Sequence, residues 1–121
     1  MTKMKKRILV VDDSRAILDV MSLALEAEGY EVSTCLTGAC FQDMEGNLPD
    51  LILLDVLLSG EDGGEICQRL KSDEHTRPIP VILISAHAGL HETAARCGAE
   101  GFLVKPFHLT ELREVVHRYL T

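Results

Sequence analysis

The sequence lacks the features that mark membrane, secreted and zinc-structured proteins. No apolar run approaches the roughly 18 residues of a membrane span, and only four apolar residues follow the basic N-terminus before two aspartates, which excludes a signal peptide. The four cysteines form no C-x-x-C pair and show no zinc-finger spacing, so a thiolate metal site is not expected. We therefore expect a reducing, cytoplasmic setting and no membrane partner.

Positive charge is also scarce. The chain has 12 lysines and arginines against 19 aspartates and glutamates, a formal net charge of −7. A nucleic-acid binder needs a basic face that releases counterions from phosphates. The basic cluster, Lys3, Lys5, Lys6 and Arg7, is interpreted as a solvated lead-in to the first strand. Nucleic acid is therefore not expected as a partner.

Size and composition predict one globular domain. The 121 residues are 46% apolar and 26% charged, which is typical of a folded chain rather than a disordered one. This length suffices for one hydrophobic core and is too short for two. We expect residues 1–121 to form a single domain with no separate output or catalytic module.

Four short aliphatic runs each close on a polar or charged residue. Ile8-Leu9-Val10-Val11 ends in Asp12-Asp13, and Leu51-Ile52-Leu53-Leu54 ends in Asp55. Val81-Ile82-Leu83-Ile84 ends in Ser85, and Phe102-Leu103-Val104 ends in Lys105. Runs of this length and composition are typical of strands buried on both faces of a parallel sheet. A fifth, more polar strand is expected at residues 31–35, as suits a sheet edge.

Segments with helical periodicity separate these strands. Ser14 is the expected N-cap of the first helix and Gly29 its stop. A weak short helix is expected at residues 38–46, ending at Gly46. Further helices are expected after the Gly-rich loop of residues 59–64, at residues 90–97 before Gly98, and at the C-terminus. In that last helix the apolar stripe is continuous, formed by Leu112, Val115, Val116, Tyr119 and Leu120. The sequence therefore predicts an α/β fold, a five-stranded parallel sheet flanked by five helices.

The polar residues that close the strands should lie together. In a parallel α/β sheet all strand C-termini meet at one edge, where ligands bind. Three carboxylates gathered there would repel one another, and Lys105 and a bound divalent cation are the two available compensations. Oxygen ligands without nearby histidine or cysteine favour a hard ion such as Mg²⁺. The edge is therefore expected to hold Mg²⁺.

Such a site suits phosphoryl chemistry. A carboxylate can act as a nucleophile and form an aspartyl phosphate, and phosphoryl transfer asks mainly for positioning and charge neutralisation. Asp55 is the expected nucleophile and, with Asp13, a direct metal ligand, while Asp12 acts directly or through water. Lys105 would bind one phosphoryl oxygen, and the Ser85 hydroxyl would bind another.

This constellation resembles the receiver domain of two-component response regulators, chemotaxis-regulator-like. The resemblance rests on Val10-Val11-Asp12-Asp13-Ser14, Leu53-Leu54-Asp55-Val56 with Asp62-Gly63 further on, Ile84-Ser85-Ala86, and the segment 98–107 containing Phe102-Leu103-Val104-Lys105-Pro106-Phe107. It spans residues 6–120. It implies a doubly wound, flavodoxin-like sheet of order 2-1-3-4-5.

The resemblance also implies a mechanism and partners. Asp55 would accept a phosphoryl group from the phosphohistidine of a histidine kinase or a histidine phosphotransfer protein, with Mg²⁺ at Asp12, Asp13, Asp55 and Leu57. Ser85 and Phe102 would be the switch residues. They would change the face of the fourth helix, fifth strand and fifth helix, which a downstream protein reads. The bond before Pro106 would be cis. A stand-alone monomer or weak homodimer is expected, autodephosphorylating rather than a turnover enzyme.

The sequence departs from this family's pattern in the loop after Asp55. Ser59 stands where proline is usual, and Glu61 where an aliphatic residue is usual. Leu57 and His87 occupy positions that tune the lifetime of the aspartyl phosphate. His108 stands where the last helix would prefer an Asp or Ser cap, with Glu111 in place three residues on.

Other interpretations of the same residues stay open. Asp12 and Asp13 could cap the first helix, and Phe102 could be an ordinary core aromatic. A Mg²⁺-dependent phosphatase with an aspartate nucleophile would want an Asp-x-Asp pattern after the first strand and a cap domain, and neither is present. A flavodoxin-like nucleotide carrier would want a Gly-rich loop there, and tryptophan is absent as well. A pseudo-receiver that only binds partners is a further alternative.

Overall fold

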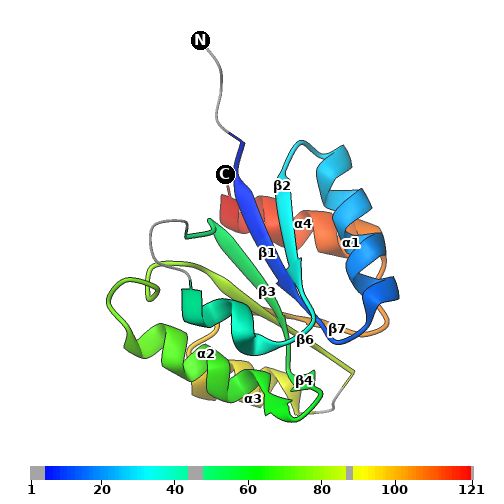
Figure 1. Ribbon diagram of the computed structural model, residues 1–121. Coiled ribbons are helices and arrows are strands. Elements are labelled where there is room, and N and C mark those ends of the chain that lie inside the picture. The colour runs from blue at the N-terminus through cyan, green and yellow to red at the C-terminus, as the bar shows by residue number, and fades with distance from the viewer. Residues whose placement is uncertain (1–4, 44–47, 87–88, 121) are drawn as a thin grey trace.

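The computed structural model describes residues 5–43, 48–86 and 89–120. Strands and helices alternate along them (Figure 1). The first half contains β1 (Arg7–Val11), α1 (Arg15–Ala27), β2 (Glu31–Cys35), the 3-10 helix η1 (Gly38–Asp43) and β3 (Leu51–Asp55). The second half contains β4 (Leu57–Leu58), β5 (Glu61–Asp62), α2 (Gly63–Ser72), β6 (Val81–Ser85), α3 (Leu90–Cys97), β7 (Gly101–Val104) and α4 (Leu109–Leu120).

The main sheet is parallel and has five strands in the order β2-β1-β3-β6-β7. Counting these five strands along the chain gives the expected order 2-1-3-4-5, so the predicted sheet is confirmed. β1, β3 and β6 are central, and β3 and β6 are buried along their whole length. β2 lies at one edge and is largely exposed, which explains its polar composition.

Side chains of the central strands alternate between the two faces of the sheet. Leu9, Ile52 and Leu83 belong to the core cluster packed with α2 and α3. Ile8 and Leu51 belong to the cluster packed with α1 and α4. Figure 1 shows these two pairs of helices on opposite sides of the sheet. The aliphatic runs are unbroken because both faces of each central strand are covered.

The ends of the helices follow local signals in the sequence. The Ser14 hydroxyl caps α1 by accepting a hydrogen bond from the Ile17 N–H, as expected. Gly98 ends α3 in the left-handed conformation, at φ 83°, which glycine adopts without a Cβ clash. At the start of α4, the Glu111 carboxylate accepts a hydrogen bond from the His108 N–H at 3.0 Å. Glu111 thus supplies half of a capping box although His108 is a poor cap.

Two expectations about the elements were wrong. The described residues contain four α-helices rather than five, because the expected helix at residues 38–46 is the 3-10 helix η1 over Gly38–Asp43. Its expected end, Gly46, lies outside the described residues. A segment of six residues is too short to offset the cost of nucleating an α-helix, and 3-10 geometry is common in such short pieces.

The second error concerns the loop after Asp55. It contains an antiparallel hairpin, β4 paired with β5, with Leu57 opposite Asp62 and Leu58 opposite Glu61. Helix α2 begins directly at Gly63, and the Asp62 carboxylate caps it by accepting a hydrogen bond from the Gly64 N–H at 2.8 Å. Within the described part of the chain, no helix has the length and apolar character needed to cross a membrane.

Candidate phosphoacceptor site

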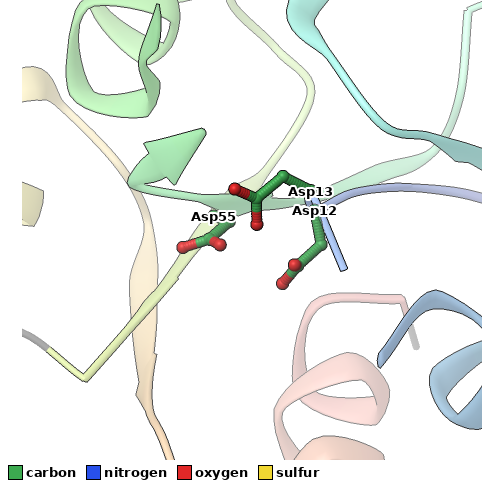
Figure 2. Close-up of side chains that lie close together, drawn as sticks. All are labelled: Asp12, Asp13 and Asp55. Atoms are coloured by element: carbon green, nitrogen blue, oxygen red, sulfur yellow. The ribbon is translucent and has the colours of Figure 1, made fainter. Parts of the chain in front are cut away.

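The register of the sheet brings three carboxylates together. Val11 of β1 pairs with Leu54 of β3, so both strands end side by side and the acids that follow become neighbours. Figure 2 shows Asp12, Asp13 and Asp55 gathered at this point. One carboxylate oxygen from each lies within 4.8 Å of the others. Asp12 and Asp13, which are far from Asp55 in the sequence, therefore form a compact cluster with it at the C-terminal edge of the sheet.

The three acids differ in burial. Asp12 is 0% exposed and Asp55 is 4% exposed, whereas Asp13 is exposed. Asp12 and Asp55 continue the alternation of Ile8 and Leu51, so their side chains lie on the side of the sheet covered by α1 and α4. The carboxylates are thus held at the boundary between the core and the open edge.

Lys105 supplies the positive charge that faces these acids. Its ammonium lies 3.0 Å from Asp12 Oδ2 and 3.3 Å from Asp55 Oδ2. Its backbone N–H donates to the Ser85 carbonyl at 2.9 Å, which extends the pairing of β6 and β7 to the base of the lysine side chain. The peptide bond between Lys105 and Pro106 is cis.

The electrostatics of the cluster leave negative charge in excess. Burial raises the pKa of Asp55, the neighbouring Asp12 charge raises it further, and Lys105 only partly opposes them. Burial by itself would lower the pKa of Lys105, but its hydrogen bond to Asp12 and the Asp55 charge outweigh this and raise that pKa. One ammonium therefore does not balance the two buried carboxylates.

Backbone groups and a hydroxyl hold the carboxylates in place. Asp12 Oδ1 accepts a hydrogen bond from the Ser14 N–H at 2.9 Å, and Asp55 Oδ1 accepts one from the Leu57 N–H at 3.2 Å. The Ser59 hydroxyl donates to Asp13 Oδ2 at 3.1 Å. The cap of α1 is Ser14 rather than Asp12 or Asp13, so capping does not account for those two acids.

The donor set fits a hard cation. All three side chains in the cluster offer carboxylate oxygens, the ligands that Mg²⁺ prefers, and one ammonium, that of Lys105, faces the two buried acids. The resemblance to receiver domains implies that an acidic triad of this kind is the magnesium site. Leu57 has an exposed side chain without a donor atom, so only its backbone could take part.

The two expected switch residues lie outside the carboxylate cluster. Ser85 ends β6 and is 1% exposed, with Val104 of β7 as its neighbour in the sheet. Phe102 is 37% exposed, and its ring meets the His91 ring of α3 edge to face, with centroids 5.3 Å apart. His87 lies outside the described residues.

Sequence reasoning missed the contacts of Ser59 and Glu61. Both were identified only as departures from a pattern, because a hydrogen bond between residues 46 positions apart, such as Ser59 to Asp13, leaves no local signal. The Gly60 between them, at φ 73°, was the available hint that the loop contains a tight turn.

Comparison with known proteins places the chain in a family. The sequence model of the response regulator receiver domain matches residues 8–117. The response regulator PleD of Caulobacter vibrioides is 46% identical over 106 residues, which cover 85% of this chain and 23% of PleD. The transcriptional regulator RpaA of Synechocystis is 40% identical over 109 residues, covering 88% of this chain and 45% of RpaA. The chain thus spans between about a quarter and a half of these curated relatives.

Solved structures agree with the sequence match. The chemotaxis protein CheY4 of Vibrio cholerae superposes with a TM-score of 0.88 at 27% identity, covering 97% of this chain and 100% of CheY4. A CheY-like receiver domain protein of Methanospirillum hungatei gives a TM-score of 0.86 at 30% identity, covering 95% of this chain and 93% of that one. Sequence and fold therefore lead to the same conclusion, and the chain belongs to the response regulator receiver domains of two-component signalling.

Proposed function

We propose that Asp55 accepts a phosphoryl group from the phosphohistidine of a histidine kinase or a histidine phosphotransfer protein. Receiver domains interact with histidine kinases, and they are signalling domains rather than turnover enzymes. The observation that carries the assignment to Asp55 is its place on β3. This strand lies between β1, which leads into Asp12 and Asp13, and β6, which ends at Ser85. Asp55 therefore follows a strand that lies between the strand leading into two further acids and the strand ending at a hydroxyl-bearing residue.

The chemistry follows from these neighbours. A carboxylate oxygen of Asp55 attacks the phosphorus, a P–O bond forms, and the P–N bond to the donor imidazole breaks. The imidazole leaves with the electron pair and is reprotonated. A Mg²⁺ ion held by Asp12, Asp13, Asp55 and the backbone at Leu57 would neutralise negative charge on the phosphoryl oxygens.

Lys105 and Ser85 bind the product in this proposal. The ammonium already lies 3.3 Å from Asp55 Oδ2, so a small movement lets it contact an oxygen of the bound phosphoryl group. The Ser85 hydroxyl would take a second oxygen. Because Lys105 follows β7 directly and Ser85 pairs beside it, both contacts would pull on the same pair of strands.

The output surface proposed here is formed by α3, β7 and α4, with Phe102 as its switch. Phe102 is exposed on β7 and its ring contacts His91 of α3, so a change in β7 would alter the packing of both elements. A downstream protein would read this change. A single receiver domain over residues 1–121, located in the cytoplasm as a monomer or weak homodimer, is part of the same proposal.

A small phosphoryl donor tests the assignment without the kinase. The protein is incubated with acetyl phosphate and Mg²⁺, and intact mass is measured before and after alkaline hydroxylamine. We expect the mass of one phosphoryl group to be added, to be lost on hydroxylamine treatment, and to be absent in Asp55→Asn. An adduct that persists in Asp55→Asn would contradict the role of Asp55. The absence of any adduct, with Mg²⁺ binding intact, would favour the pseudo-receiver alternative.

A further inference from the structure

The segment after Asp55 is a built element rather than an open loop. β4 and β5 pair with each other, and the Gly63 N–H closes the base of the hairpin by donating to the Val56 carbonyl at 2.8 Å. Leu58 is 6% exposed and belongs to the core cluster, whereas Leu57 is 65% exposed. The hairpin is therefore anchored by one buried side chain and its own backbone pairing.

The turn of this hairpin touches the acidic cluster. The Ser59 hydroxyl donates to Asp13 Oδ2 at 3.1 Å. Asp12 and Asp55 are buried and contact Lys105, but Asp13 is exposed, so its carboxylate has more freedom to rotate. A hydroxyl donor on one of its oxygens restricts that rotation. Proline, which is usual at this position in the family, has no donor for this hydrogen bond.

The second strand of the hairpin is tied to another loop. Glu61 Oε1 accepts a hydrogen bond from the Gly38 N–H at 2.8 Å, at the start of η1. The carboxylate packs closely against the Gly38 backbone, because a Cβ there would lie 2.7 Å from Glu61 Oε2 and 2.8 Å from Ile66 Cδ1. Glu61 thus holds the hairpin against the segment that follows β2.

We propose that Ser59 is a positioning residue of the cation site and that Glu61 holds in place the hairpin that presents it. The inference rests on the proposed function, because it assumes that Asp13 is a cation ligand. Partners that orient metal ligands typically change affinity by about 10–100-fold when removed. The Ser59 bond is single and exposed, so we expect an effect near the lower end of that range.

Calorimetric titration with MgCl2 tests the role of Ser59. We expect Ser59→Ala to raise the Kd for Mg²⁺ by about 10-fold, and Ser59→Thr, which keeps a hydroxyl, to restore most of the affinity. Ser72→Ala is the matched control, since its exposed hydroxyl bonds the Gln68 carbonyl away from the site. An unchanged Kd in Ser59→Ala would overturn the inference.

A test of Glu61 must separate the effect of its hydrogen bond from the effect of its charge. Glu61→Gln keeps an acceptor for the Gly38 N–H and removes the charge, whereas Glu61→Ala removes both. We expect Glu61→Ala to raise the Kd for Mg²⁺ about 3-fold or more and Glu61→Gln to stay closer to the wild type. Glu65→Gln, at an exposed glutamate in the first turn of α2, controls for loss of charge alone. Equal effects of Glu61→Gln and Glu61→Ala would show that only charge matters and would overturn the role of the hydrogen bond.

Thermal unfolding in EDTA distinguishes positioning from simple stabilisation. We expect the Tm of Ser59→Ala without metal to stay within about 2 °C of the wild type. A lowered Tm with an unchanged Kd would mean a structural role and overturn the inference. If the wild type itself fails to bind Mg²⁺, the proposed function fails. If the wild type binds and Ser59→Ala binds equally well, only the present inference fails.

Discussion

At the scale of single residues, the site contains carboxylates whose charged forms are disfavoured by burial. Asp12 and Asp55 are almost completely buried, and a buried carboxylate is stable in its ionised form only when it is paired and hydrogen-bonded. Lys105 meets part of this need for both acids. The remaining imbalance favours an added cation, and it also makes the site a source of instability in the metal-free protein.

The first prediction concerns the charge of Asp55. The pKa of Asp55 is raised in the folded protein. Its contribution to the free energy of unfolding is therefore fully present below its ordinary pKa of 3.8 and is lost as the pH rises through the pKa of Asp55 in the folded protein. Asp55→Asn should therefore stabilise the metal-free protein at pH 7 and raise its Tm above that of the wild type. The gain should shrink as the pH falls toward 3.8, because Asp55 then becomes neutral in the wild type.

Thermal unfolding in EDTA across this pH range measures the effect. Asp19→Asn, an exposed acid of α1, is the matched control and should change Tm much less. A destabilised Asp55→Asn at pH 7 would mean that the carboxylate's bond to Lys105 outweighs the cost of its burial.

The second prediction concerns Lys105. In Lys105→Met the apolar stem is kept, but Asp12 and Asp55 lose their ammonium, so we expect a loss of roughly 1–3 kcal/mol in urea unfolding at pH 7. The pKa of Lys105 is raised, so the stability from this group is present below its ordinary pKa of 10.5 and is lost as the pH rises through the folded value. The two proteins should converge at strongly alkaline pH.

Lys105→Met should also uncouple phosphorylation from the output surface. We expect amide NMR signals of β7 and α3 to shift on phosphorylation in the wild type and to shift less in the variant. Lys5→Met, at an exposed lysine, should match the wild type in both measurements. An unaltered NMR response in Lys105→Met would refute its role as the link.

The identities of the site residues and the pairing of Lys105 with the acids could be predicted, but the hydrogen bonds of Ser59 and Glu61 could not. Asp55 and Lys105 stand out in the sequence because each directly follows an aliphatic run, and strand topology then places both at one edge. The bonds from Ser59 to Asp13 and from Glu61 to Gly38 join distant segments. They depend on how the loop after β3 folds, which no periodicity encodes.

At the scale of elements, the β4–β5 hairpin determines how the chain leaves Asp55. Its pairing involves only two residues on each strand, too few to show alternation, so it could not be predicted. β2, in contrast, was predicted with the bounds that the structure has, and β3 to within one residue, because Gly29, Pro49 and Asp50 punctuate the chain before them. Short elements held by tertiary contacts escape prediction, and those with local stop signals do not.

Gly63 gives the third prediction. A Cβ at this position would overlap the Asp55 carbonyl oxygen and crowd Val56 Cα, which lies 2.8 Å from it. Gly63→Ala should therefore displace the base of the hairpin and destabilise the protein by about 2–3 kcal/mol. Urea unfolding measures this. Gly64→Ala is the comparison, because its nearest atom, Asp62 Oδ1, lies 3.1 Å away, and its loss should be smaller.

At the scale of the whole molecule, the sheet imposes the geometry of the site. Strand order puts β3 between β1 and β6, and the alternation along each strand sends Asp12 and Asp55 to the same face. A one-residue insertion within β3 would reverse this alternation and turn the carboxylate of Asp55 toward α2 and α3. The site thus depends on register as much as on residue identity.

The fourth prediction concerns metal binding by the intact domain. A ligand that binds only the folded state stabilises it by mass action, by about 2.7 kcal/mol at a concentration of 100 times Kd. We expect MgCl2 to raise the Tm of the wild type more than NaCl does at equal ionic strength. Asp13→Asn should lose most of this difference. An equal response to both salts would contradict a specific cation site.

The parallel sheet also makes the site complete only late in the synthesis of the domain, after β7. Asp12, Asp13 and Asp55 precede Lys105 in the chain, and the lysine reaches them only after β7 pairs with β6. Because domains emerge from the ribosome N-terminal end first, a nascent chain carries the three acids before it carries Lys105. Competence to receive a phosphoryl group would therefore arise only after β7 has been made, because a shorter nascent chain lacks the ammonium that contacts Asp12 and Asp55.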